Sequence, residues 1–261
     1  MIIKLYQPLA INELGRRKNQ EDSIYPVLGE TSSSQRVFVV CDGMGGLDKG
    51  EVASEVVSKT IGRMAETILE MTSHFTEADF MHCLMAAYDA LDAVDPSKEA
   101  SMGTTMTFLC FHKEGCLAAH IGDSRIYHLR PWRGHEKGVL YRSRDDSLVQ
   151  QLYERGEISY EEMRTSPRKN IILKAMQPHG NGRSLATLKH ITDIRPGDYF
   201  YLCTDGMLER MDDEDIIDIL NDSQLTETEK RQRFIEATAA NGDNHSAYLI
   251  QVKDVEQERV D

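Results

Sequence analysis

Four aspartates stand where strand-like apolar runs begin or end, each with a glycine beside it; they are Asp42, Asp123, Asp205 and Asp243. Carboxylates at the edges of a sheet, with glycines that allow a close approach, suit hard divalent cations such as Mg²⁺ or Mn²⁺. A single Asp-Gly after a strand is more often a turn than a ligand. Together with the acidic pair Glu21-Asp22, however, the four aspartates predict a metal site.

A basic run, Arg16-Arg17-Lys18, lies just before the acidic pair Glu21-Asp22. A guanidinium beside carboxylates that hold dications makes a site for a phosphate-sized anion. The same run could equally be a solvated basic turn. The glycine run Gly43–Gly46 lacks a Walker lysine, and the chain has neither an HExxH motif nor a Gly-x-Ser-x-Gly elbow.

The composition narrows the class of protein. The 261 residues carry 43 Asp and Glu against 30 Lys and Arg, a formal net charge of −13. This acidic balance argues against binding to nucleic acid or to an anionic membrane. No apolar run approaches the roughly 18 residues that cross a bilayer, and the N-terminus shows no signal-peptide pattern. Five cysteines without a CxxC pair suit buried thiols in a reducing compartment, so we expect a cytoplasmic protein.

The pattern of elements indicates how these residues are positioned. Alternating and β-branched segments predict strands over residues 2–12, 36–41, 104–112, 116–121, 124–130, 138–142, 184–191, 199–203 and 246–253. Helical periodicity predicts helices over residues 50–72, 77–94, 147–155, 213–221 and 226–240. Two consecutive helices cannot be crossovers of a doubly wound sheet, so the order indicates an α+β fold with antiparallel sheets and helices outside.

Residues 144–183 differ from the rest of the chain. They are polar, contain Pro167 and Pro178, and show little strand character. We therefore interpret them as a surface flap. The chain shows no internal repeat and no low-complexity segment. The flap would be inserted into a single domain that spans residues 1–261.

Six motifs follow one another in order: Arg17-x-Asn19-x-Glu21-Asp22, Asp42-Gly-Met-Gly-Gly46, Gly103-Thr-Thr105, Gly122-Asp-Ser-Arg125, Cys203-Thr-Asp-Gly206 and Gly242-Asp-Asn244. The series resembles the PPM family, the metal-dependent serine/threonine protein phosphatases of the 2C class, in its compact bacterial form. The resemblance implies a four-layer α-β-β-α sandwich, with two antiparallel sheets flanked by helix pairs. It also implies a centre of two Mn²⁺ or Mg²⁺ ions at one end of the sandwich.

The resemblance also implies a role for each site residue. The implied metal-binding positions are Asp42, Gly43, Asp205, Asp243, Asp22, Glu21 and Asp123. Asp42 would bridge the two ions, Asp123 would hold a weaker third ion, and Arg17 would grip the substrate phosphate. A water bridging the two ions would attack phosphorus directly and hydrolyse phosphoserine or phosphothreonine monoesters. The implied partners are phosphoprotein substrates, such as a cytoplasmic kinase or its targets, with no nucleic acid and no membrane.

Several positions depart from the family pattern, among them Met44, Asp146, Thr165, Lys174 and Gln177. Met44 stands where animal members have a histidine that can protonate the leaving group, and Asp146 stands where a histidine usually follows Asp145. In the flap, Thr165-Ser-Pro replaces a common His-Pro, and the segment 173–177 replaces Thr-Arg-Ala-Leu-Gly. The altered flap keeps open a second hypothesis, a catalytically weak or inactive regulatory domain that binds phosphoproteins on the same fold. A metal-binding structural domain without chemistry would leave Arg17 unexplained.

Overall fold

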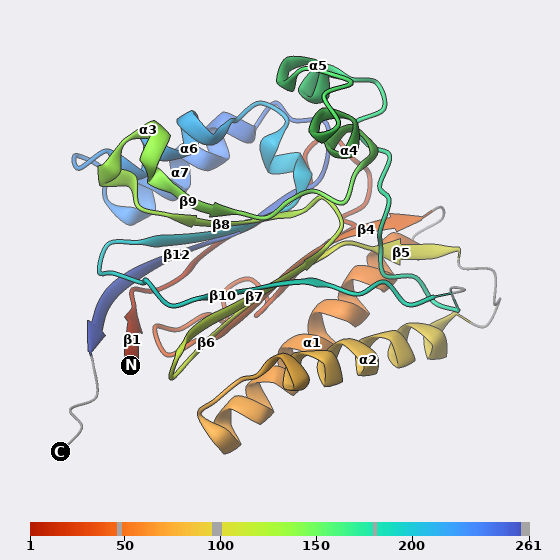
Figure 1. The fold of residues 1–261 in the computed structure, drawn as a ribbon, viewed down its shortest axis with the longest axis horizontal. Coiled ribbons are helices and arrows are strands. Elements are labelled where there is room, and N and C mark those ends of the chain that lie inside the picture. Colours follow the sequence, from red (N-terminus) through yellow and green to blue (C-terminus); the bar gives the residue numbers. More distant parts are fainter. Residues whose placement is uncertain (46–48, 96–100, 180–181, 257–261) are drawn as a thin grey trace.

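Two sheets form the centre of the molecule (Figure 1). The computed structural model describes residues 1–45, 49–95, 101–179 and 182–256. The strands of the first sheet are β1 (Ile2–Leu5), β2 (Leu9–Glu13), β8 (Arg125–Leu129), β9 (Val139–Arg142), β11 (Tyr199–Cys203) and β12 (His245–Glu256). Those of the second sheet are β3 (Asp22–Tyr25), β4 (Val37–Gly45), β5 (Met102–Thr104), β6 (Met106–His112), β7 (Gly115–Ile121) and β10 (Thr187–Ile191).

All the pairings between these strands are antiparallel. The first sheet runs in the order β1-β12-β11-β8-β9, with β2 also paired to β12. The second runs in the order β10-β7-β6-β4-β3, with β5 paired to β4. This is the α+β arrangement of antiparallel sheets that the order of elements predicted.

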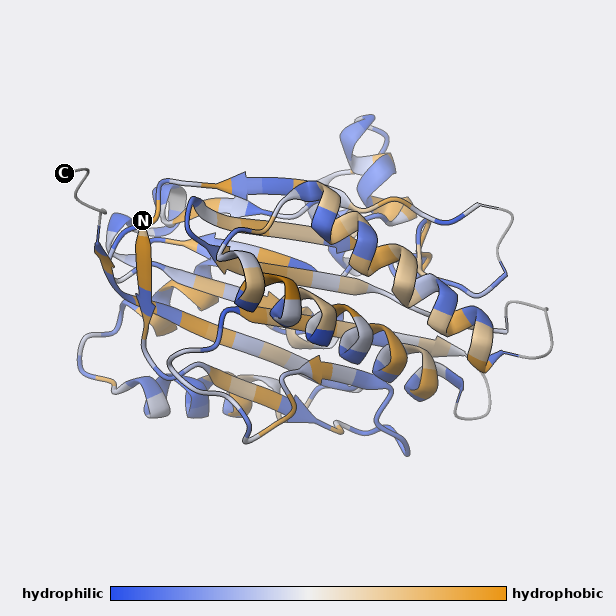
Figure 2. Ribbon diagram, turned by 90° about the horizontal axis from the view of Figure 1, so that it is seen from below, coloured by the Kyte–Doolittle hydropathy of each residue, from blue (hydrophilic) through white to orange (hydrophobic). Residues whose placement is uncertain are grey.

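Helix pairs cover the outer face of each sheet. The helices α1 (Lys49–Thr72) and α2 (Glu77–Val94) pack on the second sheet, and Figure 2 shows them lying across it from below. On the first sheet lie α6 (Asp213–Asn221) and α7 (Glu227–Thr238). Because each helix buries its apolar stripe against a sheet, the molecule has four layers, as the family resemblance implied.

Aromatic side chains fill the space between the sheets. The rings of Phe38 and Tyr248 lie 5.1 Å apart, and those of Phe111 and Phe200 lie 5.0 Å apart, in edge-to-face geometry. All four are buried, and each pair joins a strand of one sheet to a strand of the other. Burying such rings stabilises the sandwich by about 1.5–3 kcal/mol for each side chain.

Capping residues explain where the helices begin. Thr76 caps α2 with a reciprocal bond to Asp79, and Asp212 caps α6 with Asp215 in the same way. Each cap satisfies backbone N–H groups that have no partner within the helix. The starts of both helices, predicted from helical periodicity, agree with the structure.

Among the described residues, six short elements were not predicted from the sequence, namely β3, β5, the helices α3 (His135–Gly138) and α5 (Tyr160–Thr165), and the 3₁₀ helices Pro131–Arg133 and Asp205–Leu208. They have six residues or fewer, too short for a periodic pattern to be recognised. The strand predicted over residues 2–12 is wrong in one respect, because it divides into β1 and β2 around Pro8. Proline has no N–H to donate to a ladder, so it interrupts pairing there.

The flap forms two short helices, α4 (Leu148–Glu154) and α5, which stand at one end of the sandwich (Figure 1). The predicted helix over 147–155 is α4. Residues 180–181 of the flap lie outside the described residues, as does Gly46 of the second motif. Within the described part of the chain, we find no helix long and apolar enough to cross a membrane.

Candidate metal and phosphate site

The predicted site residues meet in one cavity. It has a volume of about 250 Å³, and the predicted residues that line it are Arg17, Glu21, Asp42, Gly43, Asp123, Asp205 and Asp243. Asn170 and Ile172 of the flap close another part of its wall. The remaining predicted residue, Asp22, lies beside the cavity, where it pairs with Asp42 in the register of β3 and β4. Residues up to 226 positions apart in the sequence are thereby brought to one end of the sandwich.

Hydrogen bonds to its main-chain groups hold Asp42 in place. Its N–H donates to the Thr105 hydroxyl at 2.9 Å, and its carbonyl accepts from the Thr104 hydroxyl at 2.9 Å. Gly43 comes next, and its N–H donates to the Glu21 carbonyl at 3.0 Å. A Cβ on Gly43 would lie 2.1 Å from the Gly50 carbonyl oxygen of α1, so only glycine fits there. The close approach of α1 therefore fixes this wall of the cavity.

The Asp22 carboxylate is buried, and only one of its two oxygens accepts a hydrogen bond in the described structure. Its Oδ2 accepts from the Thr204 hydroxyl at 2.9 Å, whereas its Oδ1 has no hydrogen-bond partner in the described structure. Burial, reinforced by the negative charges of Asp205 and Asp243, raises the pKa of Asp22 to about 7. A carboxyl group in this environment gains most from a nearby positive charge.

The other carboxylates of the cavity repel one another. Burial and the neighbouring aspartates raise the pKa of Asp42 and of Asp123 well above the usual value. The pKa of Asp205 is raised by burial and by Asp243. Asp123 Oδ1 is buried and unpartnered in the described structure. Such clustering of oxygen donors is characteristic of a site for hard divalent cations.

The donor set therefore fits the cations that the resemblance implies. Carboxylate and carbonyl oxygens are the ligands that Mg²⁺ and Mn²⁺ prefer. Among the described residues, no three His, Cys, Asp or Glu side chains already converge in a ligating arrangement. In this structure the carboxylates line a common cavity, and one of them is engaged by an arginine instead.

That arginine is Arg17, whose guanidinium Nη2 lies 2.6 Å from Asp243 Oδ2. The hydrogen bond to Asp243, with the nearby charges of Glu21 and Asp42, raises the pKa of Arg17. Half of its side chain is exposed, so the guanidinium lies at the mouth of the cavity. Arg17 thus lies in the cavity beside the carboxylates, and its binding of an anion stays a prediction.

Asn244 positions the loop that carries Arg17, a role that sequence reasoning missed. Its Oδ1 accepts from the Glu21 N–H at 2.9 Å, and its Nδ2 donates to the carbonyls of Leu14 and Asn19 at 2.9 and 3.0 Å. The side chain is buried. Its presence in the Gly242-Asp-Asn244 motif was the available signal, but a motif does not say which backbone groups a side chain will bind.

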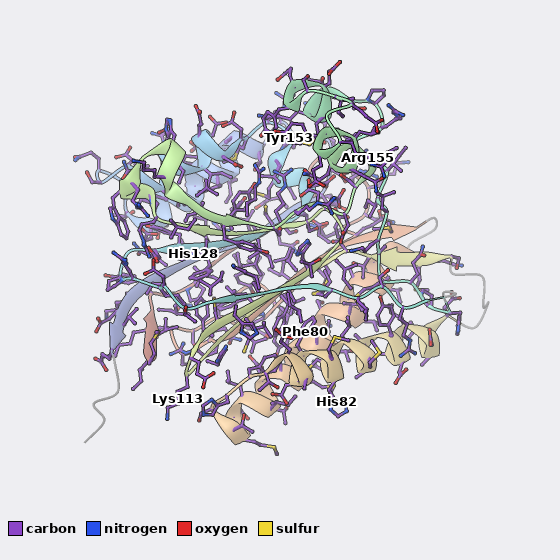
Figure 3. All side chains as sticks on the ribbon, in the orientation of Figure 1. Phe80, His82, Lys113, His128, Tyr153 and Arg155 are labelled. Atoms are coloured by element: carbon purple, nitrogen blue, oxygen red, sulfur yellow. The ribbon has the colours of Figure 1, made fainter. Side chains whose placement is uncertain are left out.

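A second cavity of about 130 Å³ lies under the flap. It shares Asp123, Asp205 and Asp243 with the first and extends to the apolar side chains Met163 and Met211. The flap helices above it are joined by Tyr153 and Tyr160, whose rings lie 6.0 Å apart. Figure 3 shows Tyr153 in the flap, above the sandwich.

Comparison with known proteins identifies the family. The profile described as "Protein phosphatase 2C" matches residues 15–241. The serine/threonine protein phosphatase PstP of Mycobacterium tuberculosis is 29% identical over 241 residues, which cover 91% of this chain and 43% of PstP. The serine/threonine phosphatase stp of Listeria monocytogenes is 29% identical over 232 residues, which cover 87% of this chain and 88% of that protein. The chain thus spans less than half the length of PstP.

Solved structures of related phosphatases have the same fold as this chain. The M. tuberculosis PstP/Ppp structure superposes with a TM-score of 0.76 at 28% identity and covers 95% of this chain and 99% of that one. The PstP catalytic domain in complex with two manganese ions superposes with a TM-score of 0.74 at 29% identity, covering 97% and 100%. This chain belongs to the protein phosphatase 2C family, the PPM class of serine/threonine phosphatases. The resemblance read from the six motifs is confirmed.

Proposed function

We propose that this chain hydrolyses phosphoserine and phosphothreonine monoesters of proteins with the help of divalent cations. The observation that carries the proposal is the cavity in which Arg17 meets Asp42, Asp205 and Asp243. The manganese-bound PstP catalytic domain, which has the same fold, supports it. Phosphoproteins would be the substrates, including a cytoplasmic kinase or its targets, and the five free, buried cysteines suit that compartment.

Seven positions would hold the cations, through the side chains of Asp42, Asp205, Asp243, Asp22, Glu21 and Asp123 and the carbonyl of Gly43. When bound, such cations neutralise the phosphate and activate a water for attack on phosphorus. Burial and the neighbouring aspartates, which raise the pKa of Asp42 and Asp205, disfavour the ionised carboxylates, and a bound cation would offset that penalty. Asp123, whose Oδ1 lacks a partner in the described structure, is our candidate for a weaker third position.

Arg17 would bind the phosphate. Its raised pKa keeps the guanidinium charged, and its exposed half allows it to leave Asp243 for the substrate. A guanidinium can donate two parallel hydrogen bonds to a phosphate, which orients the ester and stabilises the charge that shifts to its oxygens. The hydrogen bonds between the Asn244 side chain and backbone groups of Leu14, Asn19 and Glu21 would keep the Arg17 loop in place during this exchange.

The test is phosphate release from a phosphothreonine peptide by protein stripped with EDTA, with Mn²⁺ then titrated back. We expect no release without metal and restored release with Mn²⁺, and Arg17→Gln should lower kcat/KM, since the phosphate loses both a binding group and a stabilising charge. The matched control is Arg16→Gln, because Arg16 belongs to the same basic run but does not line the cavity. Tight binding of the peptide without release, in metal-replete protein, would instead favour the regulatory phosphoprotein-binding domain.

A further inference from the structure

The two ends of the flap are bonded to the supports of the site. Where the flap returns to the sheet, Met176 and Thr104 exchange backbone hydrogen bonds at 2.9 and 3.0 Å. The Thr104 hydroxyl in turn donates to the carbonyl of Asp42. The flap is thus connected by hydrogen bonds to one of the carboxylate residues of the cavity.

At the flap's other end, Asp146 makes the corresponding contacts. Its N–H donates to the Gly122 carbonyl at 2.9 Å, and its carbonyl accepts from the Leu173 N–H at 2.7 Å. Its side chain is 4% exposed, with Oδ1 2.9 Å from Lys174 Nζ and Oδ2 3.3 Å from the Gly122 nitrogen, which donates to it. Asp146 therefore joins the turn at Gly122 to the returning segment of the flap.

The turn at Gly122 sets the direction of the next residue, Asp123. Gly122 has φ +102°, and a Cβ there would lie 2.6 Å from the side chain of Thr105, so the turn has little freedom. Asp123 lines both cavities. Whatever holds the peptide groups of Gly122 therefore also fixes where the Asp123 carboxylate points.

We propose that Asp146 and Lys174, which we call the flap latch, are positioning residues that hold the flap on the Gly122 turn and thereby orient Asp123. This proposal rests on the proposed function, which makes Asp123 a ligand of a weaker third cation. Asp146 is a buried carboxylate, and its pairing with Lys174 offsets the cost of burying its charge. Both residues depart from the family pattern, which has histidine and arginine there, and the structure places the two departures in direct contact.

Two measurements that do not use turnover test the flap latch. The first is the rate of tryptic cleavage after the exposed Arg155 in the flap, followed by mass spectrometry. The second is calorimetric titration of the metal-free protein with Mn²⁺, from which the weakest binding step is taken. The variants are Lys174→Gln and Asp146→Asn. The control is Arg144→Gln, which breaks the flap's Arg144–Glu154 pair without touching Gly122.

We expect Lys174→Gln to speed cleavage after Arg155 about tenfold and to weaken the last Mn²⁺ step about tenfold, as for residues that orient a metal ligand. Asp146→Asn should do the same, and Arg144→Gln should change neither. Results for Lys174→Gln equal to those of the control would overturn the proposal. So would faster cleavage with unchanged Mn²⁺ binding, because the pair would then anchor the flap without orienting Asp123.

Lys174 is partly exposed, so its replacement decides the question even if Asp146→Asn fails to fold. A wild-type protein that released no phosphate would contradict the proposed function alone. Both readouts of the flap latch would remain valid in that case, since neither depends on the reaction.

Discussion

Two aspartates at opposite ends of β11, the buried Asp198 and the half-buried Asp205, have opposite surroundings. Asp198, just before the strand, receives hydrogen bonds from Arg130 Nε and Nη2 at 2.7 and 2.8 Å and lies 2.8 Å from His128 Nε2. Burial alone would raise its pKa, but the bonds from Arg130 and His128 hold that pKa below the usual value. Asp205, just after the strand, has Asp243 as a neighbour, and its pKa is raised.

The difference separates a carboxylate that the chain itself pairs from the carboxylates of the proposed cation site. Asp198 is satisfied by the chain itself, in a cluster where the His128 ring stacks on Phe200 at 4.6 Å. Figure 3 shows His128 well away from the flap. At the site end Arg17 pairs with Asp243, but burial and the neighbouring aspartates raise the pKa of Asp42 and Asp205. Such a cost in stability is retained where a ligand supplies the missing charge. The comparison predicts that equivalent substitutions at the two ends will have opposite consequences.

Of the substitutions considered, Asp205→Asn should have the largest effect, which is a loss of phosphatase activity. We expect phosphate release with Mn²⁺ to fall on the order of 10³-fold, because one charge that holds cations is lost. In EDTA the free energy of unfolding should stay equal or rise, since repulsion from Asp243 is relieved. Peptide dephosphorylation and thermal unfolding check the two parts, and retained activity together with lost stability would contradict the comparison.

The convergence of the four candidate aspartates Asp42, Asp123, Asp205 and Asp243 could be predicted from the sequence because each lies near the end of a strand that is long enough to recognise. Asp42 lies within β4, towards its end, and Asp205 follows β11. The supports of the site could not be predicted. Thr104, Thr105 and Asn244 act through backbone groups of residues far away in the sequence, and only the folded chain determines those contacts.

Asp198, which is paired with Arg130, shows the same limit of prediction from the sequence. Asp198 has no motif around it, and nothing in the sequence connects it with Arg130, 68 positions earlier. The layers of the fold could be predicted because burial patterns and caps are local. Whether a buried carboxylate meets positive or negative neighbours could not be predicted, since that depends on which side chains the sheets bring together.

Asp198→Asn should affect stability instead of activity. We expect the free energy of unfolding to fall by about 3–5 kcal/mol, because Arg130 would be left buried without its partner. Phosphate release per folded molecule should not change. The matched control is Asp193→Asn, whose side chain is 65% exposed and lies 3.2 Å from the same Arg130; it should cost about 0–1 kcal/mol. Equal losses in chemical denaturation would show that burial of the pair is not what matters.

The smallest and most specific effect concerns pH. Because the pKa of Asp198 is lower in the folded than in the unfolded chain, its ionised form stabilises the fold above the ordinary carboxyl pKa of about 3.9. That contribution is lost as pH falls through the folded pKa, where Asp198 becomes protonated. The difference in unfolding free energy between wild type and Asp198→Asn should therefore be constant near neutral pH and shrink below about pH 4. Urea unfolding of both proteins across this range measures it, and a difference that persists at pH 3 would mean that packing around Asp198, not its charge, stabilises that end of β11.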